Sequence, residues 1–367
     1  MRTVLPAILV AAAACGDASQ PGFTSGASIT TTSLLSSSGT STSSSADSTS
    51  SSTDDSAGSS GSASTGTVSD VGVVPDFPSG QPPGCKGKVD ILFMISSLGT
   101  MQVEQKQLLA SFPGFIDTLE HKLAGFDLHI IAPNPTGEWA GDICEHVPEG
   151  CLENYPNCGE TAKDYECVAF PKLTTNCDRE LAAGLVFNAG FNAANRICDL
   201  YGGNRYIISG EPNLPDAFEC IAKVGTGGGD PPMGDALIAA LSSKLNGEGR
   251  CNEGFLREDA LLFIVVINDT EDTESKSWPY QQYNAIIAAK KDPSSVIMLG
   301  ITGQVLKEGE PEIPGCTYDT DGKDELHDLI TMFPYYVEGD TCAKNYAPYF
   351  ADAADKIAEA CGSFVPQ

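Results

Sequence analysis

Two long apolar runs dominate the hydrophobic pattern of the chain. Lys88–Ile95 and Ala260–Ile267 are apolar on both faces and have the length of a strand. Such a run suits the centre of a parallel sheet, where both faces are covered. Shorter strands are predicted at Asp127–Ala132, Arg205–Ser209 (a candidate edge strand), Ser295–Ile301 and Tyr335–Glu338.

Helical spacing fills most of the sequence between these strands. Apolar residues recur every three or four positions from Leu108 to Leu123, although Pro113-Gly114 should kink this helix or split it in two. Further helices are predicted at Ala217–Val224, Met233–Leu245, Tyr280–Lys290, Lys323–Phe333 and Ala347–Ala360. Strands that alternate with helices predict an α/β fold of three layers, with a mainly parallel central sheet and helices on both faces.

The regular pattern is lost in residues 133–204, which are rich in Cys, Gly, Pro and Asn. An insertion of this length needs cross-links to be ordered. Apart from Cys15, the chain has 12 cysteines: Cys85, Cys144, Cys151, Cys158, Cys167, Cys177, Cys198, Cys220, Cys251, Cys316, Cys342 and Cys361. An even number in an exported protein indicates disulfides. His146 lies among the cysteines of the insertion and could bind zinc together with them, but no paired CxxC motif is present. Proximity in sequence suggests the pairs Cys220–Cys251 and Cys342–Cys361.

The first residues have the pattern of an export signal. Arg2 precedes a short apolar run, Val4–Ala14, and small residues lead into Cys15. Ala12-Ala13-Ala14-Cys15 resembles the lipobox of bacterial lipoproteins, in which the cysteine thiol is acylated, although Ala12 stands where Leu is usual. The alternative is an ordinary secretory signal cleaved near Ala14. We expect residues 1–15 to be a lipoprotein signal with a lipidated Cys15.

Residues 16–84 consist mainly of Ser, Thr, Gly and Ala. Such a stretch buries too little apolar surface to offset its ordering entropy, so we expect a disordered linker. A flexible chain of this length spans on the order of 45 Å. It would hold a folded domain, residues 85–367, away from a membrane.

The predicted domain is strongly acidic. Six of the 49 acidic residues and one of the 21 basic residues precede Cys85, which leaves 43 acidic and 20 basic residues and a formal net charge of −23. Nucleic acid and anionic lipid head groups are therefore excluded as favoured partners.

Two segments resemble the von Willebrand factor A (vWA) family, in its cysteine-rich lipoprotein branch of Gram-negative bacteria. Val89–Met101 is similar to the first strand and metal-site loop of the family, and Leu261–Asp269 to the strand that delivers a second metal-associated Asp. Thr226, followed by a glycine-rich run, stands where the family presents a Thr. The resemblance covers nearly all of residues 85–367 except the insertion. It implies a cation-dependent adhesion site at the carboxyl ends of the strands.

The chain departs from this pattern at the decisive positions. Where the family has Asp-x-Ser-x-Ser, the sequence has Ser96-Ser97-Leu98-Gly99-Thr100. Ser96, Thr100, Thr226 and Asp269 are the candidate site residues, and they offer one carboxylate and three hydroxyls to Mg²⁺ or Ca²⁺. We expect this degenerate site to hold no tightly bound metal.

The same loops could bind two other kinds of ligand. The hydroxyls and amides of Ser96–Thr100 could receive an anion, but Asp269 and Glu271 would oppose it. The acidic loop Asp269–Glu274 could bind Ca²⁺, although a solvated acidic loop is the simpler interpretation. Asp319–Asp324 lacks the downstream Glu of an EF-hand and is interpreted as a turn before a helix.

No common hydrolase or nucleotide-binding motif is present, and His121, His129, His146 and His327 form no recognisable constellation. His129 lies in an apolar strand and is expected to be a satisfied core residue. Glu138 and Asp142, beside Trp139, could form a site, but a rim of the cross-linked insertion is the favoured interpretation. We therefore expect a non-enzymatic, lipid-anchored binding module of the cell envelope, at the outer membrane or cell surface or in the periplasm, with a protein or glycan partner. The alternatives are a structural envelope protein and an unrecognised hydrolase.

Overall fold

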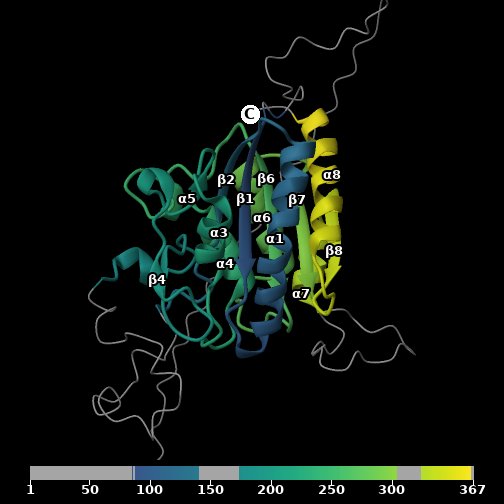
Figure 1. Cartoon of the computed structure of the whole chain (residues 1–367). Helices are drawn as coiled ribbons and strands as arrows, with labels where there is room; N and C mark the ends of the chain where they lie inside the picture. The colour runs from purple at the N-terminus through teal and green to yellow at the C-terminus, as the bar shows by residue number, and fades with distance from the viewer. Residues whose placement is uncertain (1–84, 86, 140–172, 304–323, 365–367) are drawn as a thin grey trace, which may run out of the picture. The chain divides into compact units, whose positions relative to one another are not determined.

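The central sheet of the predicted domain has six strands. The computed structural model describes Cys85 and residues 87–139, 173–303 and 324–364. The strand order is β5-β2-β1-β6-β7-β8, and Figure 1 shows β2, β1, β6, β7 and β8 in this order. The bounds are β1 Lys88–Ile95, β2 Asp127–Ile131, β5 Ile207–Ile208, β6 Leu261–Asn268, β7 Val296–Thr302 and β8 Tyr335–Asp340. All neighbouring pairs are parallel except β5, which pairs antiparallel with β2 at the sheet edge. The predicted mainly parallel sheet is confirmed.

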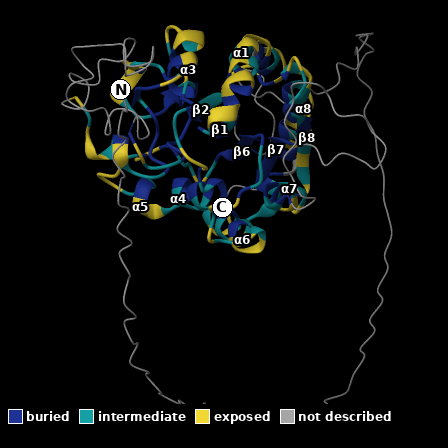
Figure 2. Ribbon diagram, turned by 90° about the horizontal axis from the view of Figure 1, so that it is seen from below, coloured by how far each residue is buried: buried dark blue, intermediate teal, exposed yellow. Residues whose placement is uncertain are grey.

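Helices cover both faces of this sheet (Figure 2). One face carries α1 Gln102–Lys122, α3 Leu214–Ala222 and α8 Ala347–Ser363, and the other carries α4 Met233–Leu241, α5 Ser243–Asn246, α6 Pro279–Lys290 and α7 Glu325–Thr331. Successive residues of β1 point to opposite faces, so Phe93 lies in the first core and Leu92 and Met94 in the second. The three-layer α/β fold predicted from the sequence is confirmed.

Two predicted helices differ from expectation. α1 continues through Pro113 as a single helix, so the predicted split is wrong. Phe112 and Phe115 flank the proline and pack around Phe93, with ring centroids 6.5 and 6.1 Å away, and this packing outweighs the lost backbone hydrogen bond. Conversely, Met233–Leu245 is interrupted at Ser242, whose extended backbone separates α4 from α5.

The disulfides that the structure describes are Cys85–Cys361, Cys177–Cys251 and Cys198–Cys220, and Cys342 is also disulfide-bonded. Both pairs suggested by sequence proximity are therefore wrong. The remaining cysteines, Cys144, Cys151, Cys158, Cys167 and Cys316, lie outside the described residues, as does His146 with the zinc alternative.

The errors have a simple geometric cause. Cys220 belongs to the core on the α1 face of the sheet, whereas Cys251 packs against the core on the α4 face, so the sheet separates them. Cys342 follows the carboxyl end of β8, and Cys361 lies near the far end of α8. A helix of this length spans about 25 Å, so the two sulfurs lie at opposite ends of the sheet.

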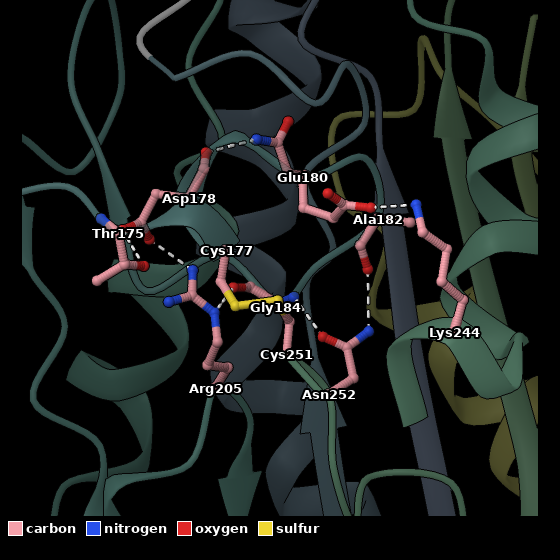
Figure 3. The surroundings of a disulfide bond; sticks show 11 residues. Thr175, Cys177, Asp178, Glu180, Ala182, Gly184, Arg205, Lys244, Cys251 and Asn252 are labelled. Atoms are coloured by element: carbon pink, nitrogen blue, oxygen red, sulfur yellow. Dashed lines mark hydrogen bonds and ion pairs between the residues drawn. A yellow bond between two sulfur atoms is a disulfide. The ribbon is translucent and has the colours of Figure 1, made fainter. Parts of the chain in front are cut away.

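The described end of the insertion, residues 173–204, is fastened to the domain (Figure 3). It includes a short hairpin, β3 Phe187–Asn188 with β4 Arg196–Ile197. Beside the Cys177–Cys251 disulfide, the Arg205 guanidinium donates to the Asp178 carboxylate at 2.5 Å. The Asn252 side chain also donates to Ala182 O and accepts from Gly184 N, at 3.0 and 2.8 Å. The cross-link predicted to order this segment therefore acts together with a buried polar network.

Candidate functional site

The sequence of β1 and β6 places Ser96 and Asp269 at the same rim of the sheet. β1 and β6 are adjacent and parallel, with Ile95 opposite Ile267, and the Ser96 amide donates to Ile267 O at 2.9 Å. The chain proceeds from β1 outward to β2 and β5, and then returns to β6 on the other side of β1. This reversal makes the carboxyl ends of β1 and β6 the switch point, where open α/β sheets bind ligands. Ser96 and Asp269 are both buried there.

Thr100 and Thr226 lie on the two loops next to these residues. Thr100 is exposed in the 3-10 turn Gly99–Met101, and its hydroxyl hydrogen-bonds the Asp269 carboxyl. Leu98 forms a parallel bridge with Gly228, which brings the loop that contains Thr226 alongside. The structure thus brings together all four residues predicted from the sequence.

Gln105, in the first turns of α1, connects the same loops. Its side-chain amide donates to Ser96 O at 3.0 Å and to Gly225 O at 2.9 Å. The Thr226 hydroxyl accepts from the Asn192 side chain at 2.7 Å, and its amide donates to Phe191 O at 2.7 Å. The described part of the insertion therefore helps to shape the rim.

A second buried carboxyl group at the switch point was missed in the sequence. Glu104 lies in the first turn of α1 and is 7 % exposed. Burial raises its pKa, and the nearby Asp269 raises it further. The spacing could have indicated this residue. Glu104 is four positions after Thr100, and on a helix that starts at the site two such residues lie on the same side of the helix.

The electrostatics of the rim favour protonated or partnered carboxyl groups. Burial raises the pKa of Asp269, the Thr100 hydrogen bond opposes this shift, and Asp230 adds to it. Among the described residues, no basic side chain contributes to the pKa shift of Asp269 or Glu104. Two carboxyl groups are thus buried near one another, with no counter-ion among the residues that the structure describes.

Buried polar atoms without hydrogen-bond partners concentrate at the same place. Of the eight such side-chain atoms in the described part of the chain, five lie at the switch point: Ser97 Oγ, Glu104 Oε2, Gln105 Oε1, Asn268 Oδ1 and Asp269 Oδ1. Buried polar groups in proteins nearly always have partners, so such a concentration needs an explanation. All five are oxygen atoms that can accept a hydrogen bond.

No protein-family model matches the chain, and no curated protein is significantly similar to it. The vWA resemblance therefore stays a prediction. Across the described ranges, no helix has both the length and the apolar character that crossing a membrane requires.

The rim departs at Ser96 and Leu98 from the cation site that the resemblance implies. Leu98 offers no ligand, and the Ser96 hydroxyl already accepts from the Leu98 amide at 3.3 Å. Within the described ranges, no three His, Cys, Asp or Glu side chains are grouped so that they could hold a metal ion.

The acidic loop after β6 has a structural role at Asp272. Its carboxylate accepts from Gly234 N at 2.7 Å and from Ser275 N at 3.2 Å, which fixes the loop against the start of α4. The Asp269–Glu274 loop is therefore not a free carboxylate cluster. The anion alternative at Ser96–Thr100 is opposed by Glu104 in addition to Asp269.

The other residues singled out in the sequence lie elsewhere. His129 Nδ1 is 2.9 Å from Phe255 O, as expected for a satisfied core histidine. Trp139 is buried against Phe187, with ring centroids 5.5 Å apart, whereas Asp142 lies outside the described residues. Of the predicted turn at 319–324, only Asp324 is described, and its carboxylate caps α7 through Leu326 N and His327 N.

Proposed function

We propose that the domain is a non-enzymatic binding module that recognises a protein or glycan through the switch-point rim, without a functional metal site. One observation carries this proposal: among the described residues, five buried polar atoms have no hydrogen-bond partner at the place where α/β sheets bind ligands. A buried polar atom that has no partner, water included, costs about 1–3 kcal/mol. A fold that serves only as a spacer has no reason to retain that cost at one rim.

The anchoring part of the proposal rests on the sequence and the disulfides. Disulfides form and persist mainly in oxidising compartments outside the cytoplasm. Together with the lipobox-like Ala12–Cys15, they support a lipoprotein held in the cell envelope by an acylated Cys15. Labelling with radioactive palmitate should mark the wild type and leave Cys15→Ser unlabelled. Equal labelling of the variant would refute the anchor.

Paired charge reversals test the binding face. Asp230→Arg changes an exposed acidic residue of the rim, and Glu258→Arg makes the same change on the exposed loop before β6, at the opposite end of the sheet. In pull-downs from envelope extract with the full chain, we expect Glu258→Arg to retain the partner and Asp230→Arg to lose it. Equal retention by both variants would contradict a binding role for the rim.

The chemistry of the partner follows from one further arm of this experiment. Periodate oxidation of the extract destroys glycans with vicinal diols and leaves polypeptides largely intact. Loss of capture after periodate assigns a glycan, and unchanged capture assigns a protein. If Asp230→Arg captures everything that the wild type captures, the structural-lipoprotein alternative is supported instead.

A further inference from the structure

A second feature lies at the other end of the sheet, away from the rim. A groove of about 380 Å³ opens between the C-terminal half of α1, the start of β2 and the edge strand β5. Its walls are apolar and include Ile116, Leu123, Phe126, Leu128, Ile208 and Leu214. Ile116, Leu128, Ile208 and Leu214 are only partly buried. We call this the α1–β5 groove.

The polar groups of the α1–β5 groove are already engaged. Ser209 Oγ accepts from Leu128 N at 2.7 Å, and the Glu211 carboxylate accepts from Tyr201 N at 2.9 Å. Sites for small polar ligands orient them with a few convergent polar groups. Because these groups are occupied by the domain's own backbone, the groove is suited to a few apolar side chains.

The linker joins the domain next to this groove. Cys85 is fixed by its disulfide to Cys361, and Gly87 O accepts from Asp127 N at 2.6 Å. Asp127 directly follows Phe126, which lines the groove. The eight residues from Phe77 to Cys85 can span up to about 28 Å, so the chain just before Cys85 can reach the groove.

The linker carries a dense group of large apolar residues just at this distance. Val71, Val73, Val74 and Phe77 fall within seven positions of a chain segment that is otherwise mostly Ser, Thr, Gly and Ala. Val74 and Phe77 each precede a proline, which biases both residues toward an extended backbone. In an extended chain, Val71, Val73 and Phe77 point to the same side.

We propose that Val71–Phe77 docks in the α1–β5 groove and fixes the direction in which the linker leaves the domain. The linker would then depart from the end of the sheet opposite the switch-point rim. If the rim binds a partner as proposed above, this exit directs it away from the membrane. Only this consequence rests on the proposed function, and the docking itself does not.

Photo-crosslinking of the full chain tests the docking. Phe77 is replaced by p-benzoylphenylalanine, and Phe23, a phenylalanine far from Cys85 in the same linker, receives the same replacement as the control. We expect position 77 to crosslink within its own chain to residues 116–128 and 207–214, and position 23 not to do so. Absence of groove crosslinks from position 77 overturns the proposal. Crosslinks between two chains would assign the groove to a second copy and overturn it as well.

Hydrogen exchange gives an independent measurement. The variant Val71→Ser, Val73→Ser, Phe77→Ser is compared with the matched control Leu34→Ser, Leu35→Ser, Phe23→Ser. Loss of docking should speed amide exchange in β5 and the last turns of α1 on the order of tenfold, whereas the control should match the wild type. Equal exchange in both variants contradicts the proposal. Because neither experiment uses the rim, a failed docking is distinguishable from a failed rim.

Discussion

A buried ion pair at the amino end of the sheet gives the most quantitative prediction. Asp90 in β1 is fully buried, and Arg257 donates to both of its oxygens at 2.7 Å, once through its backbone amide and once through Nε. The same guanidinium donates to the Asp127 carboxylate at 2.6 Å and to Val89 O at 3.2 Å. Arg257 therefore joins the loop before β6 to β1 and β2.

Arg257→Ala should lower the free energy of unfolding by about 3–5 kcal/mol, because it removes the guanidinium that is hydrogen-bonded to the buried Asp90 carboxylate. The control is Lys88→Ala. Lys88 pairs with Asp259 at 2.8 Å, but both side chains are about a third exposed, so its removal should cost less than about 1 kcal/mol. Equilibrium urea denaturation with the disulfides intact measures both values.

The pH dependence separates loss of charge pairing from loss of packing. Burial raises the pKa of Asp90, and Arg257 opposes that shift. In Arg257→Ala the pKa of Asp90 should rise further, so the folded variant binds a proton that the unfolded chain releases above the ordinary value of 3.8. The deficit should be small at low pH and grow as the pH rises. A deficit below about 1 kcal/mol at neutral pH, or one independent of pH, would refute this reasoning.

Three further predictions concern the rim and the cross-links. Calorimetric titration of the wild type with Mg²⁺ or Ca²⁺ should show no micromolar binding, whereas Ser96→Asp with Leu98→Ser should gain affinity; micromolar binding by the wild type contradicts the degenerate site. Burial raises the pKa of Glu104 above 4.5 and that of Asp269 above 3.8. The stability that each protonated carboxyl group contributes to the fold is therefore fully present below those values and is lost as the pH rises. Glu104→Gln with Asp269→Asn should therefore flatten the fall of unfolding free energy between about pH 4 and pH 8, and an unchanged slope contradicts the assigned shifts. Removing the Cys85–Cys361 disulfide, with a sequence separation of 276, should lower the free energy of unfolding by on the order of 5 kcal/mol. Removing Cys198–Cys220, with a separation of 22, should lower it by about 3 kcal/mol. Equal losses in urea denaturation would show that loop length does not determine the effect.

The fold could be predicted because its signals are local. The run that became β6 is apolar from Leu261 to Ile267, and the run that became β1 is apolar except at Lys88 and Asp90, so both are typical of strands covered on both faces. Ser96 and Asp269 could also be placed, since each directly follows one of these strands. Neighbouring parallel strands have their carboxyl ends at the same edge of the sheet, whatever the sequence between them.

The features that the sequence did not reveal depend on contacts between distant segments. Cys198 and Cys220 are paired because the end of the insertion lies beside α3. The hydrophobic periodicity of the sequence does not predict this contact. Glu104 lies in the first turn of a helix, where acidic residues usually interact with the helix dipole in water. Its burial arises from segments that are distant in sequence, because Asp269 and Tyr346 both lie close enough to interact with it electrostatically.

The buried carboxyl groups at the rim allow the two leading functions to be weighed against each other. Residues that conflict with stability are expected at functional sites, where the conflict serves binding. If the rim is a relic, Glu104→Gln with Asp269→Asn should stabilise the domain near neutral pH and leave partner capture unchanged. If the rim binds, the same change should stabilise the domain and weaken capture. Stability and capture measured on one double variant therefore separate a binding surface from the remnant of one.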